Sequence, residues 1–147
     1  MIDAVPPVLR RVRAAAALGV ALALTACTPS DRPRDLDVVF DEEQTTTDVL
    51  PDEMLAYLAV DGGTTRRLGA DDALTFYAAR SNEGAATCLV LVDGAGDGVA
   101  GCGTGRNPTG IEVGNGEDAA MLVMPGTDFT DLEQSGWTRL GEFLAVR

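Results

Sequence analysis

The order of apolar and polar positions divides the chain into three parts. Residues 14–26 are almost entirely apolar and uncharged, residues 28–48 are polar and acidic, and residues 49–147 alternate short apolar runs with Gly, Pro, Asn and Asp. Short apolar runs separated by turn residues are typical of strands in a folded domain. We therefore expect one compact domain at residues 49–147, preceded by a linker and a leader.

Within residues 49–147 the pattern predicts an α+β domain that is mostly β. Short helices are expected over Val49–Leu58 and Phe129–Ser135. The expected strands are Thr64–Leu68, Leu74–Arg80, Ala86–Val92, Val99–Gly103, Gly110–Val113, Ala119–Met124 and Leu140–Val146. Because Ala86–Val92 and Ala119–Met124 are apolar on both faces, we expect both to be central, covered by helices or by a second layer of strands. The expected fold is a small antiparallel sheet with one or two short helices and one disulfide.

Local signals set the ends of the two helices. Asp61–Gly63 is a turn sequence and is expected to end the first helix. Thr130 and Glu133 have the spacing of a capping box at the start of the second helix, and Gly136 suits its end. Trp137, the only Trp, is expected to pack into the core rather than to bind a ligand.

Composition and charge exclude several classes of function. The chain has 147 residues, a net charge of -12 and a pI of about 4.2, so its surface repels phosphate backbones and no nucleic-acid partner is expected. His and Lys are absent, which excludes Ser-His-Asp and Cys-His sites and Schiff-base lysines. No zinc-type cluster of Cys and His is present, and no cofactor is expected. Paired carboxylates are the remaining route to catalysis, which the many acids permit without indicating it.

The leader has the layout of a secretory signal peptide over residues 1–26. Arg10, Arg11 and Arg13 form a basic region before the apolar residues 14–26. That apolar stretch is shorter than the about 20 residues that a permanent transmembrane helix needs. The basic region leaves the export route open between the Sec and twin-arginine pathways.

Leu24-Thr25-Ala26-Cys27, directly after the apolar stretch, resembles the lipobox of bacterial lipoproteins. The resemblance implies a diacylglycerol thioether on Cys27, cleavage before it, and acyl chains such as palmitate that anchor the chain in the membrane. Two or three acyl chains give a stable anchor where a single chain binds only marginally. The implied partner is therefore membrane lipid, and the implied location is the extracytoplasmic face of the cell membrane.

Residues 27–48 are expected to be the lipidated Cys27 followed by an acidic, disordered tether. Pro29, Pro33 and many acids favour a solvated linker, whose 21 residues after Cys27 would reach roughly 25 Å as a flexible coil. Leu36–Phe40 is an apolar island within it. We expect this island to pack on the edge of the domain or to stay loose, and the alternative is a docking motif for a partner. Without residues 1–26 the net charge becomes -14, since Asp3 and three Arg are lost.

The cysteine count supports the same assignment. The chain has three cysteines, and an odd number in an exported protein normally leaves one thiol over. If Cys27 carries lipid, Cys88 and Cys102 remain, and a pair on neighbouring strands in an oxidising compartment is expected to form a disulfide. Such a bridge stabilises the fold by roughly 3 kcal/mol. The alternative is a redox pair, against which the spacing and the lack of a nearby His or Lys both argue.

Asp93–Gly98 has part of the residue pattern of a calcium-binding loop. Asp93 and Asp97 occupy positions 1 and 5 of an EF-hand pattern, but Ala95 fails position 3 and Thr104 replaces the closing Glu. We therefore interpret the segment as a hairpin turn, and Asp93 and Asp97 are the only candidate metal pair.

The domain also resembles a group of small exported or membrane-tethered actinobacterial proteins over about residues 64–147. The resemblance is carried by Arg67-Leu68-Gly69, Tyr77-Ala78-Ala79-Arg80, Cys88-Leu89-Val90, Ala100-Gly101-Cys102-Gly103, Ala120-Met121-Leu122-Val123, Pro125-Gly126, Gly136-Trp137 and Leu144-Ala145-Val146. That group has no assigned activity, so the resemblance implies fold and compartment and adds no function.

Three hypotheses for the function follow, in order of preference. The first is a lipid-anchored extracytoplasmic binding or interaction module, with an envelope protein as its partner. The second is an envelope enzyme that uses paired carboxylates. The third is a passive structural lipoprotein of the cell envelope. A pocket or an exposed apolar patch, and the acids that border it, would separate them.

Overall fold

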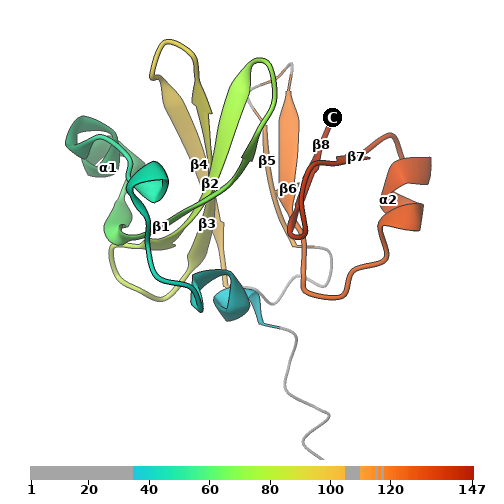
Figure 1. The fold of residues 1–147 in the computed structure, drawn as a ribbon, viewed down its shortest axis with the longest axis horizontal. Helices are drawn as coiled ribbons and strands as arrows, with labels where there is room; N and C mark the ends of the chain where they lie inside the picture. The colour runs from blue at the N-terminus through green and yellow to red at the C-terminus, as the bar shows by residue number, and fades with distance from the viewer. Residues whose placement is uncertain (1–34, 105–109, 115, 117) are drawn as a thin grey trace, which may run out of the picture. The chain divides into compact units, whose positions relative to one another are not determined.

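A computed structural model describes residues 35–104, 110–114, 116 and 118–147 (Figure 1). The helices are the 3-10 helices η1 (Leu36–Phe40) and η2 (Thr46–Asp48) and the α-helices α1 (Asp52–Leu58) and α2 (Phe129–Gln134). The strands are β1 (Val60–Ala70), β2 (Leu74–Ser81), β3 (Thr87–Asp93), β4 (Gly98–Gly103), β5 (Ile111–Gly114), β6 (Ala119–Leu122), β7 (Thr138–Arg139) and β8 (Leu144–Val146). They form two antiparallel sheets, with strand orders β1-β2-β3-β4 and β5-β6-β8-β7.

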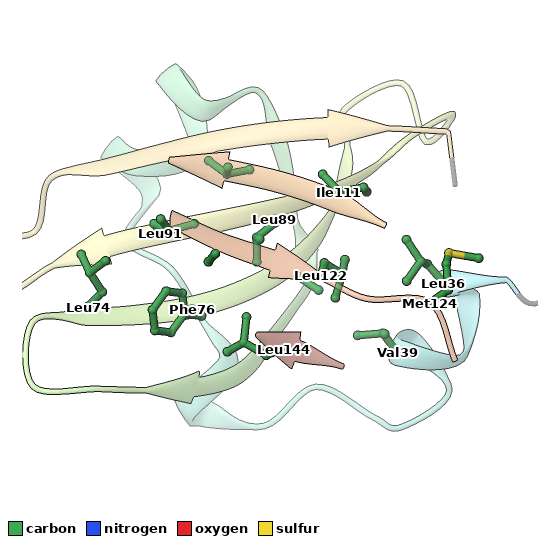
Figure 2. Close-up of a cluster of buried hydrophobic side chains, with 13 residues drawn as sticks. Leu36, Val39, Leu74, Phe76, Leu89, Leu91, Ile111, Leu122, Met124 and Leu144 are labelled. Carbon is green, nitrogen blue, oxygen red and sulfur yellow. The ribbon is translucent and has the colours of Figure 1, made fainter. Parts of the chain in front are cut away.

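The two sheets pack face to face around the main core. Apolar side chains from both sheets meet there, and Figure 2 shows them between the strands. The first sheet contributes Leu74, Phe76, Ala78, Leu89 and Leu91, and the second contributes Ile111, Val113, Ala120, Leu122 and Leu144. Each large side chain buried in this way stabilises the fold by about 1.5–3 kcal/mol. The predicted α+β fold, mostly β, is therefore confirmed, with two small sheets in place of one.

Each sheet is covered on its outer face by one α-helix, so that the layers run α1, first sheet, second sheet, α2 (Figure 1). On β3, Leu89 and Leu91 face the second sheet, whereas Cys88 and Val90 face α1, as the two-residue period of a strand requires. Met121 on β6 likewise faces Trp137 and the α2 side. The strands predicted to be central are central in both sheets, because their second apolar face is covered by a helix.

The prediction that Asp61–Gly63 ends the first helix is wrong. Helix α1 ends at Leu58, and its C-cap residue Ala59 has a left-handed backbone with φ of 56°. The chain then enters β1 directly, and the glycines lie in a bulge where the pairing with β2 shifts between Asp61 and Arg66. A Cβ at Gly62 would lie 2.5 Å from Leu55 Cδ1. An added Cβ would displace the end of the Leu55 side chain, so the glycine eases the approach of the helix, and a turn-like sequence lies inside a strand.

The C-terminal region also differs from the prediction in two places. Leu140–Val146 is not one strand, because the chain turns after β7 and returns as β8, with the Leu140 N–H donating to the Leu144 carbonyl. The N-cap of α2 is Asp128, whose carboxylate accepts from the Thr130 N–H at 2.9 Å. Thr130 therefore lies inside the helix instead of capping it.

The end of α2 and the position of Trp137 agree with the predictions. The Gly136 N–H donates to the Glu133 carbonyl and the Trp137 N–H to the Leu132 carbonyl, which is the hydrogen-bond pattern of a Schellman cap. Trp137 is buried in the cluster beneath α2. The Arg147 guanidinium lies 4.4 Å from the centre of its ring.

The predicted disulfide is confirmed. Cys88 on β3 and Cys102 on β4 are directly opposed in the register of the two strands, and their sulfur atoms lie 2.06 Å apart. Cys88 is fully buried under α1, whereas Cys102 is exposed. The bridge ties the edge strand β4 to the centre of the first sheet.

The predicted boundary of the compact domain at residue 49 is wrong, since residues 35–48 are folded onto it. Leu36 and Val39 are buried in the core between the sheets, and Figure 2 shows them at one end of that core beside Met124. Residues three apart share one face of a 3-10 helix, so η1 presents both side chains to the same site. The apolar island therefore packs on the edge of the domain. The first part of the predicted tether lies outside the described residues.

Candidate functional site

The segment Asp41–Asp48 runs beside β1, and a groove of about 510 Å³ lies between them. The groove is lined from three parts of the chain, by Val38, Val39, Asp41, Glu42, Glu43, Thr45, Asp48, Arg66, Arg67, Leu68, Glu142 and Phe143. Residues 142 and 143 come from the turn between β7 and β8. The three parts lie near residues 42, 67 and 142, so they are about 25 and 75 residues apart in sequence. A local sequence pattern cannot link segments that far apart.

Asp48 fixes the end of this segment against β1. It is only 7% exposed, and its carboxylate accepts from the Thr45 N–H at 2.6 Å, the Thr45 hydroxyl at 2.7 Å and the Arg67 N–H at 2.8 Å. Burial acts to raise the pKa of Asp48, but the hydrogen bonds from Arg67 and Thr45, with the charge of Arg66, outweigh it and lower this pKa below its ordinary value. Asp48 is therefore an ionised structural anchor.

Gln44 holds the middle of the segment on the bulge of β1. Its side-chain amide donates to the Gly62 carbonyl at 2.7 Å and to the Thr65 hydroxyl at 2.7 Å. The bulge leaves backbone groups of β1 without strand partners, and a buried polar group without a partner is costly. Gln44 supplies the missing donor, so this side of β1 is hydrogen-bonded even though no strand lies beside it.

Two arginines hold η1 and the beginning of the segment that follows it. Arg66 donates through Nε and Nη2 to the Glu42 carbonyl, at 2.9 and 2.7 Å. Arg80, on β2, pairs with the Asp37 carboxylate and lies 4.5 Å from the centre of the Phe40 ring. These contacts use backbone carbonyls and an exposed acid, and they leave the acidic side chains around the groove itself unused.

The groove combines an apolar floor with an acidic rim. Leu68 and Phe143 are partly buried against the core, and Val38 is 41% exposed. Asp41, Glu42, Glu43 and Glu142 stand at the rim. Within the part of the chain that the structure describes, none of these four carboxylates accepts a hydrogen bond or forms an ion pair. The surface is suited to a ligand that carries both apolar and positively charged groups.

The candidate metal pair lies elsewhere, in the turn between β3 and β4. The Asp93 carboxylate accepts from the backbone N–H groups of Ala95 and Asp97, both at 2.9 Å. The hairpin turn is therefore present as interpreted, and Asp93 closes it. Among residues 35–104, 110–114, 116 and 118–147, no group of three or more His, Cys, Asp and Glu side chains could hold a metal ion.

Cys88 and Cys102 form the structural disulfide and lie outside the groove. Cys27 and the leader lie outside the described residues. In the described part of the chain, no helix has the length and apolar character needed to cross a membrane.

Sequence reasoning missed the residues of the groove. One signal was present, because Thr45 and Asp48 have capping-box spacing, and the Thr45 N–H donates to the Asp48 carboxylate at η2 as such a box requires. Leu36 and Val39 gave a second signal through their spacing of three residues. Glu142 and Phe143 gave none, since only the fold brings their turn to β1.

Comparison of this chain with protein-family models, with curated proteins and with solved structures finds no match in any of the three.

Proposed function

We propose that this protein is a lipid-anchored, extracytoplasmic binding module. Cys27 would hold it on the outer face of the cell membrane, and the groove beside β1 would receive an envelope protein partner. The groove carries the binding part of the proposal, because Val38 is 41% exposed there and the carboxylates at its rim have no hydrogen-bond or ion-pair partner among the described residues.

Two observations support the anchored location. The Leu24–Cys27 box directly follows a basic and then apolar leader. The Cys88–Cys102 disulfide fits an oxidising compartment and leaves Cys27 as the one cysteine available for lipid. The two observations are independent, since one lies in the leader and the other in the folded domain.

The lowered pKa values of Asp48 and Asp128 give no support to the carboxylate-enzyme hypothesis. A general acid in such an enzyme needs a raised pKa. Asp128 has its pKa lowered by hydrogen bonds from Thr130, and Asp48 has its pKa lowered by those from Arg67 and Thr45. Both groups act as caps of backbone N–H donors, which is a structural use of a carboxylate.

The anchor is tested by expressing the full chain and its Cys27→Ala variant in a bacterial host. We expect the full chain in the membrane fraction, with an intact mass that corresponds to loss of residues 1–26 and addition of acyl chains. The variant should lose the acyl mass and leave the washed membranes. A Thr28→Ala variant is the control and should behave as the full chain does. An unchanged mass and membrane attachment in Cys27→Ala would show that the proposed anchor is wrong.

The binding surface is tested by photo-cross-linking in the same cells. A photoreactive amino acid at Val38, in the groove, should give a discrete cross-linked product. The same amino acid at Tyr57 is the matched control, because Tyr57 is 56% exposed on α1 and lies outside the groove. Equal products from both positions, or none from either, would favour the passive structural lipoprotein.

A further inference from the structure

The geometry points to an extended cationic peptide as the occupant of the groove, presented by a protein of the same membrane. This inference deepens the proposed function and rests on it for the location of the partner. The class of ligand follows from the charge of the groove, from its apolar floor and from the hydrogen bonds that already occupy β1.

The charge of the groove selects a cation. Five acids line it against two arginines. The Arg66 guanidinium donates to the Glu42 carbonyl, and the Asp48 carboxylate accepts from Thr45 and from the Arg67 N–H, so four acids remain against the two arginine charges. The remaining acids at the rim leave the groove with an excess of negative charge, which a positively charged ligand would complement. Arg or Lys side chains supply that charge.

The floor requires apolar contact as well. Val38 is 41% exposed at the groove, and Leu68 and Phe143 are covered on their inner sides by the core between the sheets. A simple cation such as a metal ion or a polyamine would not cover these side chains. An extended peptide that alternates apolar and basic residues presents one kind to the floor and leaves the other within reach of the rim.

The mode of binding is through side chains and not through addition of a strand. Strand addition needs free backbone groups on an edge strand. At the groove, the Arg67 N–H is taken by Asp48, and the carbonyls of Gly62 and Thr65 accept from Gln44. The groove therefore recognises the peptide through the charge and shape of its side chains.

The length of the chain before Asp35 limits where the partner can be. Asp35 follows Cys27 by eight residues, so their Cα atoms are at most about 28 Å apart. Helix η1 adds about 10 Å before the rim begins at Asp41. If Cys27 is the anchor, the groove stays within about 40 Å of the bilayer surface. A second copy of this acidic chain and an anionic headgroup are both repelled, which leaves a basic segment of a membrane protein.

The experiment uses the full chain purified in detergent micelles and a fluorescent ten-residue peptide that alternates Val and Arg. Fluorescence polarisation should show saturable binding that weakens as salt is added. Neutralising the rim with Asp41→Asn, Glu43→Gln and Glu142→Gln should weaken binding about tenfold. The matched control is Asp72→Asn, Glu83→Gln and Glu133→Gln, which removes the same charge from exposed positions outside the groove. It should change affinity by less than about twofold, because distant exposed charges are screened.

Peptides of matched charge test the floor and the sign of the ligand. A Ser/Arg peptide should bind about threefold or more weakly, because it lacks the apolar contact, and a Val/Glu peptide should not bind. Equal losses in the rim variant and the control variant would show general attraction to an acidic protein and would overturn the inference. A rise in affinity on Arg32→Gln and Arg34→Gln would also overturn it, since the chain's own basic residues would then be the occupant.

The measurement in micelles does not depend on Cys27, so its failure is separate from failure of the anchor. The location of the partner is tested by repeating the Val38 cross-link in the Cys27→Ala background. Loss of the product on release of the chain from the membrane supports a membrane partner. Retention of the product would show that the partner is not confined to the membrane.

Discussion

The two edges of the first sheet are held in different ways. At β4 the edge is covalent, because Cys102 is bonded to Cys88 and the strand lies so close to β5 that a Cβ at Gly101 would be 2.4 Å from Val113 Cγ2. At β1 the edge is polar, because it is held by side chains from residues 36–48. The covalent edge is held by a bond that does not titrate, whereas the polar edge depends on the ionised Asp48, on hydrogen bonds from Gln44 and Arg66, and on the buried side chains of Leu36 and Val39. The groove lies at this polar edge, beside β1.

The largest expected effect is on the covalent edge. The Cys88→Ala/Cys102→Ala variant should lower the free energy of unfolding by about 2–5 kcal/mol, because the unfolded chain is no longer restrained across 14 residues. Urea unfolding followed by Trp137 fluorescence measures this change. Peptide binding in the groove should be retained under conditions where the variant is folded. Loss of binding in the folded variant would show that the two edges are coupled.

The next largest effect is expected at Leu36, a buried apolar residue of η1. Leu36→Ala should cost about 2–4 kcal/mol, since Leu36 is fully buried between the sheets and its truncation leaves a cavity. Val38→Ala is the matched control on the same helix, and its exposed side chain should change stability by less than about 0.5 kcal/mol. Similar values for the two variants would contradict the packing of η1 on the core.

Asp48→Ala should lower the stability by about 1–3 kcal/mol, because it leaves the Arg67 N–H without its acceptor. The matched control is Asp52→Ala, at an exposed position at the start of α1. Amide hydrogen exchange provides the local readout, and the Arg67 N–H should lose protection only in the Asp48 variant. Unchanged protection at Arg67 would rule out the anchoring role of Asp48.

The pH dependence of stability should follow Asp48 at the acid end. The pKa of this group is lower in the folded chain than its ordinary value of 3.8, so the unfolded state takes up a proton first. The stability from Asp48 is complete above about pH 4 and is lost as the pH falls through the lowered pKa. Urea unfolding between pH 2 and pH 6 should show a shallower acid loss for Asp48→Asn than for the wild type. An identical slope for both would contradict this assignment.

The smallest effect is expected from the exposed ion pair at η1. Arg80→Gln removes the pairing with Asp37 and the contact with Phe40 and should cost about 0.5–1 kcal/mol at low salt. Arg139→Gln is the control, because Arg139 lies 4.5 Å from the centre of the Phe129 ring and forms no ion pair among the described residues. Added salt should reduce the effect at Arg80 more than that at Arg139. An equal salt response would mean that the Asp37 pair contributes nothing.

Those parts of the fold that depend on the local repeat of apolar and polar residues could be predicted from the sequence. The strands β3 and β6 were placed as central because their apolar residues occupy both faces, and Cys88 and Cys102 were paired because both lie on apolar runs around a turn. The boundary at residue 49 failed because Leu36 and Val39 make only one apolar turn among acids, and composition outweighed their spacing. The groove could not be predicted, because the contact between β1 and Glu142–Phe143 is a property of the packed sheets.

The order of contacts along residues 36–48 has a mechanical consequence. A force applied at Asp35, as an anchor at Cys27 would apply it, would act first on η1, through Leu36, the Asp37 pair with Arg80 and Val39. It would then act on the Arg66 bonds to Glu42, and last on Gln44 and Asp48. Because these contacts follow one another along the segment, such a force would reach them one after another and not together.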